Sequence, residues 1–111
     1  MTARPKQSPE RSERYLRQVA SMPCKVCGIE GFSQAAHVPA DGKAIKQDDR
    51  ETFALCAARP GVNGCHQDFD QYRLFTSDIS RMVGRAWAAD TRRQIIAMGK
   101  WPPRLPKMDE I

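Results

Sequence analysis

The most informative stretch of this sequence opens with Pro23-Cys24-Lys25-Val26-Cys27-Gly28 and closes with Gly64-Cys65-His66, followed by Asp70. Between these ends lie Ala36-His37-Val38 and Leu55-Cys56. All 4 cysteines and both histidines of the chain fall within this stretch. Thiolates and imidazoles gathered in this way are typical of metal binding.

The cysteines form two pairs, Cys24/Cys27 and Cys56/Cys65. The first pair has the Cys-x-x-Cys spacing of a zinc knuckle, and the second encloses a longer insertion rich in Gly, Pro and Asn, which can loop out and bring Cys65 back. Zinc prefers four thiolate or imidazole ligands in a tetrahedron. We therefore predict a structural zinc on the four cysteines, with His66 as the alternative to Cys65 for the fourth ligand.

Length and composition also favour a bound metal. A chain of 111 residues with 7% aromatic residues and a mean hydropathy of −0.61 forms one small domain with a thin core, and such domains usually need a disulfide or a metal. The N-terminus has no apolar signal segment, and no stretch approaches ~18 apolar residues. We therefore expect a cytoplasmic protein, with reduced cysteines available for metal.

Charge is distributed unevenly around the net value of +5. Basic residues predominate in 1–25 and 81–107, whereas acidic residues outnumber them in 26–80. An acidic centre suits cation binding, and basic flanks suit a polyanion such as DNA. A surface that is merely basic and well solvated remains the alternative.

The order of elements predicts an α+β fold in one domain over residues 9–101, with a disordered basic arm at 1–8 and a flexible tail at 102–111. The first helix is expected to start at Ser8-Pro9-Glu10 and to end before Pro23. The remaining elements are expected to be strands at 33–38 and 52–55, a helix at 65–75, and a helix at about 78–98.

The last predicted helix has two contrasting faces. Its apolar face carries Ile79, Val83 and Ala86, flanked by Met82 and Trp87. The opposite face carries Arg81, Arg85 and Arg92, which either contact nucleic acid or form the solvated side of the helix. The apolar phase weakens near Asp90, which predicts a break or bend there.

The histidines and Asp70 can build a second site. His66 and Asp70 are four residues apart and therefore share one helix face, where they can bind a divalent cation and leave room for a phosphate oxygen and water. His37 ends a strand opposite this helix and can deprotonate a water for attack on phosphorus. A lone strand histidine is more often structural, and that alternative stays open.

In this order, the residues resemble the HNH (ββα-metal) endonucleases, above all the small zinc-containing phage and prophage proteins of the YbcO-like and Ref-like kind. The resemblance covers roughly residues 23–75. The matching residues are Cys24-Cys27, Ala36-His37, Gly42-Lys43 with Lys46, Asp49, Leu55-Cys56, and Cys65-His66 with Asp70.

The resemblance implies a zinc-stabilised ββα-metal unit with flanking helices. It also implies metal-dependent hydrolysis of DNA phosphodiesters, which leaves 5′-phosphate and 3′-hydroxyl ends. It implies His37 as the general base, and His66 with Asp70 as ligands of a catalytic Mg²⁺ or Mn²⁺. Lys43 and Lys46 are candidates for phosphate contact, with ordinary solvated lysines as an equal alternative.

Three departures from the family pattern bear on the site. Ala36 stands where many HNH nucleases place a metal-binding Asp or His. The middle Asn is missing, and Asp49, or less favourably Asp48, is the nearest candidate to orient His37. The insertion before Cys65 is the third. The alternative function is a zinc-containing nucleic-acid-binding or adaptor module without chemistry.

Overall fold

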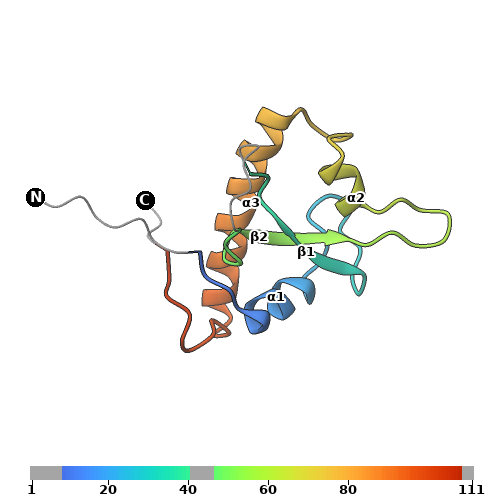
Figure 1. Ribbon diagram of the computed structural model, residues 1–111. Coiled ribbons are helices and arrows are strands. Elements are labelled where there is room, and N and C mark those ends of the chain that lie inside the picture. Colours follow the sequence, from blue (N-terminus) through green and yellow to red (C-terminus); the bar gives the residue numbers. More distant parts are fainter. Residues whose placement is uncertain (1–8, 41–46, 109–111) are drawn as a thin grey trace, which may run out of the picture.

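A computed structural model describes residues 9–40 and 47–108. The predicted arm at 1–8, Lys43 and Lys46, and the end of the tail at 109–111 lie outside these residues. The fold is α+β, as the sequence predicts, and the described residues form three helices and one two-stranded antiparallel sheet (Figure 1). The elements are α1 (Glu13–Ala20), β1 (Ser33–His37), β2 (Thr52–Cys56), α2 (Cys65–Asp70) and α3 (Ser77–Ala97).

The two strands pair from Ser33 opposite Cys56 to His37 opposite Thr52. All five residues of β2 are buried, because helices cover both faces of the sheet. In Figure 1, α2 and α1 lie on opposite sides of the hairpin, and α3 passes the end of the sheet. This arrangement creates two cores, one on each side of the strands.

The first core is an aromatic cluster between the sheet, α2 and α3. The Phe53 ring meets the rings of Phe69 and Trp87 edge to face, at centroid distances of 5.3 Å and 5.4 Å. Leu55 and Cys56 are buried in the same cluster. Edge-to-face aromatic pairs add to the hydrophobic gain of burial. The cysteine end of β2 is therefore rigidly supported by the core.

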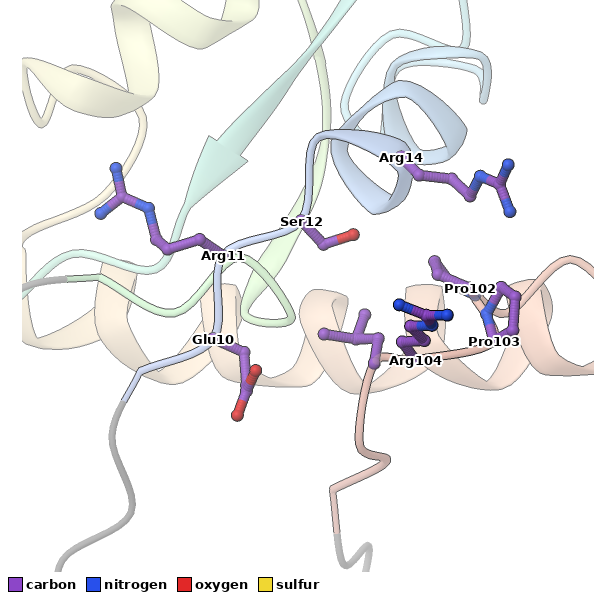
Figure 2. A pocket seen from close by; sticks show the side chains of 8 residues that line it. Glu10, Arg11, Ser12, Arg14, Pro102, Pro103 and Arg104 are labelled. Atoms are coloured by element: carbon purple, nitrogen blue, oxygen red, sulfur yellow. The ribbon is translucent and has the colours of Figure 1, made fainter.

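The second core lies between the sheet, α1 and the end of the chain. Tyr15 packs edge to face on Trp101 at 5.0 Å, and Leu105 is 8% exposed in the same cluster. Trp101 Nε1 donates a hydrogen bond to the Leu105 carbonyl at 2.7 Å. Figure 2 shows residues 102–104 beside the segment that leads into α1. The prediction of a flexible tail from residue 102 is wrong for residues 102–106, because Leu105 anchors them and Arg50 Nη1 holds the Pro106 carbonyl at 2.9 Å.

The first helix begins later than the sequence predicts, at Glu13 rather than just after Ser8. Ser12 is its N-cap, and the Ser12 Oγ accepts a hydrogen bond from the Tyr15 N–H at 3.1 Å. The residues before Ser12 pair with the segment that precedes β2, because the Glu10 carbonyl accepts a hydrogen bond from the Asp49 N–H at 2.8 Å. Tertiary pairing thus decides where α1 starts.

The second helix ends at Asp70, and the sequence prediction carried it to Phe75. Tyr72 follows with φ +57°, a left-handed conformation that a helix cannot continue through. The short helix places His66 and Asp70 on its only complete turn.

α3 is continuous, and the predicted break near Asp90 is not present. Asp90 lies at the surface, where it accepts a 2.5 Å hydrogen bond from Lys25 Nζ. The buried face consists mainly of small or polar residues, namely Ser80, Gly84, Ala88, Thr91, Arg92 and Ile95.

The predicted apolar face of α3 is largely wrong. Ile79 and Met82 are 40% and 60% exposed, and of the five residues proposed only Trp87 is part of the aromatic core. Small residues are preferred on the true face because α3 lies close to β2: a Cβ built on Gly84 would be 3.4 Å from the Phe53 ring. The hydrophobicity of the residues alone therefore does not identify a helix face whose small residues allow the helix to pack close to a strand.

Candidate metal centre and adjoining cavity

The four cysteines form one cluster at the end of the sheet. Their Sγ atoms all lie within 4.8 Å of one another, and the Sγ atoms of Cys27 and Cys56 are 3.8 Å apart. Tetrahedral zinc with Zn–S bonds of about 2.3 Å requires sulfur atoms roughly 3.8 Å apart. Cys24, Cys27, Cys56 and Cys65 are therefore positioned to bind a metal ion, and their geometry is consistent with structural zinc.

The first cysteine pair is held by a tight turn. The Gly28 N–H donates to the Cys24 carbonyl at 2.9 Å, and Gly28 has φ +77°, which favours glycine. The Cys24 N–H donates to the Ile29 carbonyl at 3.0 Å, and the Lys25 N–H donates to the Ala54 carbonyl at 2.9 Å. These bonds attach the turn to β2 and place Cys24 and Cys27 beside Cys56.

The insertion between Cys56 and Cys65 folds back on itself as the sequence predicts. Arg59 and Val62 exchange backbone hydrogen bonds of 2.9 Å and 2.8 Å, which close the loop. Gly64 then touches the backbone of Ala57 so closely that a Cβ would lie 2.6 Å from it. Only glycine permits this contact, and the contact returns the chain so that the Cys65 N–H reaches Cys56 Sγ at 3.3 Å.

The surroundings of the sulfur atoms favour thiolate at two of the four cysteines. Burial on its own raises the pKa of Cys56, but the Cys65 backbone N–H and the Arg59 side chain outweigh it and lower that pKa to about 6. Burial likewise opposes the ionisation of Cys24, whose pKa is nevertheless lowered by backbone N–H groups of Cys27, Cys56 and Val26. In the metal-free protein, burial and the neighbouring thiols raise the pKa of Cys65. A bound cation would hold all of them as thiolates.

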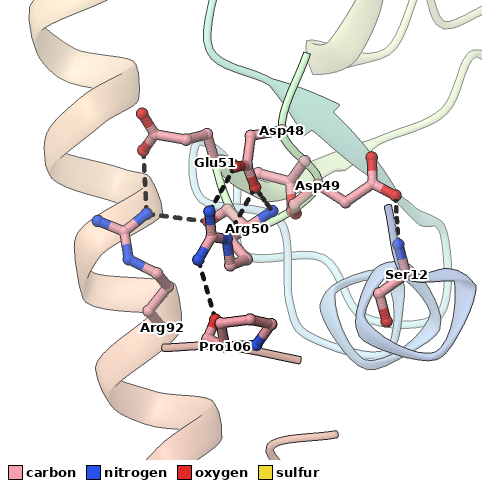
Figure 3. A network of polar contacts seen from close by, with 8 residues as sticks. Ser12, Asp48, Asp49, Arg50, Glu51, Arg92 and Pro106 are labelled. Atoms are coloured by element: carbon pink, nitrogen blue, oxygen red, sulfur yellow. Dashed lines mark hydrogen bonds and ion pairs between the residues drawn. The ribbon is translucent and has the colours of Figure 1, made fainter. Parts of the chain in front are cut away.

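His37, at the end of β1, pairs with a buried carboxylate. Its Nε2 lies 3.0 Å from Oδ1 of Asp49, which is 5% exposed. The other Asp49 oxygen accepts the Ser12 N–H at 2.8 Å (Figure 3). Because a carboxylate accepts, the proton of the neutral imidazole lies on Nε2, and the lone pair of Nδ1 remains to accept a proton.

His66 is held between two side chains. Its Nδ1 lies 2.8 Å from Gln34 Oε1, and its Nε2 lies 3.3 Å from Asp70 Oδ2. If Gln34 accepts the Nδ1 proton, Nε2 faces the Asp70 carboxylate either with a second proton, as in an ion pair, or with a lone pair that could bind a cation together with Asp70. Gln34 did not figure among the sequence candidates, since a polar residue on a strand carries no signal of this contact.

One cavity of about 350 Å³ joins the two histidines. Its walls come from β1, α2 and the residues that follow each of them. The lining residues are Ala35, His37, Pro39, Ala40, Gln47, His66, Asp70 and Tyr72. The structure therefore brings together His37, His66 and Asp70, and it sets Asp49 behind His37. Cys65 belongs to the metal cluster and His66 to the cavity, so Cys65 is the fourth member of the cysteine cluster.

The predicted arginine face of α3 is not a single surface. Arg92 is 5% exposed, and its Nη1 donates to the Arg50 carbonyl at 2.9 Å and meets Glu51 Oε1 at 3.0 Å. The prediction that it lies with Arg81 and Arg85 on an exposed face is wrong, because Arg92 is used to attach α3 to the segment before β2. Arg81 pairs with Asp78, and Arg85 is exposed.

A polar network surrounds the segment that carries Asp49. Arg50 makes bonds of 3.0 Å and 2.7 Å to the two oxygens of Asp48 (Figure 3). Burial alone would raise the pKa of Asp48, but the Arg50 guanidinium lowers it below its ordinary value. Asp48 is thus a structural partner of Arg50, and of the two sequence candidates only Asp49 is bonded to His37.

Within residues 9–40 and 47–108, the cysteine cluster is the one group of three or more Cys, His, Asp or Glu whose ligand atoms converge. No helix in this part of the chain is long and apolar enough to cross a membrane. Comparison with protein-family models, curated proteins and solved structures finds no match to this chain.

Proposed function

We propose that the chain is a metal-dependent endonuclease of the HNH type that hydrolyses phosphodiester bonds in DNA. The observation that carries the proposal is the cavity that joins the His37–Asp49 pair to the His66–Asp70 pair. A candidate base and a candidate cation site lining one cavity are the two parts that hydrolysis of a phosphodiester needs. The succession β1, β2, α2 agrees with a ββα-metal unit.

The cysteine cluster is proposed to hold a structural zinc. Four sulfur ligands leave no open coordination position, so this centre is closed to substrate and serves the fold alone. A reducing compartment such as the cytoplasm keeps the four thiols available for it.

His37 is proposed as the general base. Asp49 fixes its ring and its tautomer, so that Nδ1 accepts the proton of the attacking water. The buried carboxylate is itself fixed by the Ser12 N–H, and the orientation of the imidazole therefore depends on contacts from α1.

His66 and Asp70 are proposed to hold the catalytic Mg²⁺ or Mn²⁺. Two ligands at right angles around such an ion, each at roughly 2.1 Å, stand roughly 3 Å apart, close to the 3.3 Å between His66 Nε2 and Asp70 Oδ2. Gln34 directs the Nε2 lone pair toward this position. When bound, the cation supplies Lewis-acid stabilisation of the charge that develops on phosphate oxygens.

The second candidate function is a nucleic-acid-binding or adaptor module that keeps the zinc and lacks catalysis. It is favoured by one observation: no third ligand from the described residues converges on His66 and Asp70. Ala36, which stands where a further ligand is common in the family, is fully buried in the aromatic core.

Supercoiled plasmid separates the two functions. Wild-type protein with Mg²⁺ or Mn²⁺ is expected to nick the plasmid, leaving 5′-phosphate and 3′-hydroxyl ends, and His37→Ala is expected to be at least about 100-fold slower. Equal nicking by His37→Ala, or no nicking by wild type under any metal, would reject the enzyme in favour of the binding module.

A further inference from the structure

A second cavity, of about 330 Å³, lies between the segment before α1 and the end of the chain. Three arginines line it, together with one acidic residue, one serine and an apolar wall of Pro102, Pro103 and Leu105. The charged and polar members are Glu10, Arg11, Ser12, Arg14 and Arg104. The lining therefore carries an excess of positive charge, which favours an anionic ligand over a cationic one.

The three arginines are exposed, and none has a hydrogen-bond or ion-pair partner among residues 9–40 and 47–108. Arg17 and Arg93 are exposed but paired, with Glu13 at 3.6 Å and with Asp90 at 3.8 Å. Exposed Arg85 is like the three pocket arginines, in that it has no partner among the described residues, but it stands alone on α3. In Figure 2, Arg14 and Arg104 extend on one side of the segment 10–12, and Arg11 extends on the other side, where β1 ends. Unpaired guanidinium groups retain their full capacity for an anionic ligand, and their planar donor arrangement matches phosphate.

The cavity is connected to the candidate catalytic site through a single residue. Ser12 lines it, and the Ser12 N–H holds the Asp49 carboxylate that pairs with His37. The contacts from the pocket to His37 therefore run through Ser12 and Asp49, at 2.8 Å and 3.0 Å, which places the pocket near the candidate catalytic site.

We propose that this arginine pocket binds the phosphate backbone of DNA away from the scissile bond. Arg14 and Arg104 contact a phosphate, Arg11 extends the contact toward the end of β1, and the exposed Pro103 offers an apolar surface to the sugar. The proposal rests on the proposed function for its choice of DNA as ligand. The arginine pocket differs from the proposed catalytic site in its residues and in its chemistry, since the pocket binds DNA and does not cleave it.

The test is a binding titration of labelled duplex DNA with full-length, zinc-loaded protein and no added Mg²⁺ or Mn²⁺. The variant Arg14→Gln/Arg104→Gln is compared with Arg17→Gln/Arg93→Gln, which removes the same charge from α1 and α3. Salt is varied between about 50 and about 200 mM. The pocket variant is expected to bind at least about tenfold more weakly than the control variant, and the slope of log K against log salt is expected to fall by about 2, or about 1 for each lost phosphate contact.

Equal affinities and slopes for the two double variants would overturn the proposal, as would a wild-type protein that binds no DNA at any of these salt concentrations. Loss of affinity for a labelled acidic peptide with DNA binding equal to that of the control would assign the pocket to a protein partner and would also overturn it. The single variants, each matched to a single control, repeat the comparison if a double variant does not fold.

Plasmid nicking distinguishes this failure from that of the proposed function. Pocket-dependent DNA binding without nicking would retain the pocket and reject the nuclease. Nicking by wild type, with equal DNA binding by the two double variants, would retain the nuclease and reject the pocket.

Discussion

Cys65 and His66 are neighbours in the chain and belong to different sites. Cys65 starts α2 with its sulfur in the cysteine cluster, and His66 turns to the cavity that it shares with His37. Successive helix residues point about 100° apart, so one short helix can serve a closed centre with one residue and an open one with the next.

At Asp49, a change of one atom tests the orientation of His37. Asp49→Asn keeps the shape but leaves one acceptor oxygen where two are used, by the Ser12 N–H and by His37. We expect plasmid cleavage to slow about 100-fold or more, with DNA affinity unchanged. Asp48→Asn is the matched control, because Asp48 binds Arg50 rather than His37. It is expected to lower the melting temperature and to leave the cleavage rate intact; the reverse pattern would assign the role to Asp48.

Replacement of Arg59 is expected to change the pH at which the protein loses zinc. Arg59 helps to lower the pKa of Cys56 from 9.0 to about 6. Because the Cys56 pKa is lowered, the contribution of the Cys56 thiolate to zinc binding is complete above the ordinary thiol pKa of 9.0. This contribution is lost as pH falls through about 6. Arg59→Gln raises the Cys56 pKa, so zinc should dissociate at a higher pH than from wild type in a chelator-dye titration. Arg73→Gln, with the same charge change at an Asp68 ion pair, should match wild type. If wild type, Arg59→Gln and Arg73→Gln all lost half of their zinc at the same pH, Arg59 would have no effect on the Cys56 thiolate.

The cysteine cluster could be predicted from the sequence because spacing carries the signal, with Cys24 and Cys27 on a turn. Spacing also predicts that His66 and Asp70, one helical turn apart, lie together, and both line one cavity; their role in binding a cation stays a prediction. Gln34 and Ser12 could not be predicted. Each acts through a contact with a residue more than 30 positions away, and nothing local marks such a contact.

At the scale of elements, α3 shows where sequence periodicity fails. The hydrophobic pattern selects Ile79 and Val83, but the helix buries Gly84 and Ala88 instead, because close approach to β2 requires small residues. The charge of Arg92 likewise led to the wrong prediction that this residue is exposed, whereas Arg92 is buried and pairs with Glu51. The strands and the start of α2 were easier to predict, since turn residues and cysteines mark their ends, whereas the end of α2 at Asp70 was not predicted.

The attachment of α3 through Arg92 can be measured. Arg92→Met leaves the Arg50 carbonyl without this donor and Glu51 without this ion pair. We expect the free energy of unfolding in urea to fall by about 2–3 kcal/mol. Arg93→Met, at the next and exposed position, should change it by less than about 0.5 kcal/mol. Equal effects would show that Arg92 does not hold the helix.

In the whole molecule, the cysteine cluster connects parts of the chain that are far apart in sequence. It joins the turn at 24–28, the end of β2 and the start of α2, while the two cores lie on either side of a sheet of only two strands. Small domains with so little sheet depend on a metal for much of their stability.

Removal of the metal should therefore destabilise the entire domain. After treatment with a chelator under reducing conditions, we expect the melting temperature to fall by at least about 15 °C, and to recover when zinc is returned. Metal analysis of the untreated protein should find one zinc per chain. A protein that contains no metal and melts at the same temperature before and after the chelator would disprove a structural role for the cluster.

Cys65 and His66 are proposed to divide their work, with Cys65 binding a structural zinc and His66 belonging to a hydrolytic site. The decisive measurement is the cleavage rate of zinc-loaded His66→Ala protein with Mn²⁺ and supercoiled plasmid. We expect this rate to be about 100-fold or more below that of wild type, with the zinc content unchanged at one per chain. Cleavage at the wild-type rate, or loss of zinc from the variant, would refute this division.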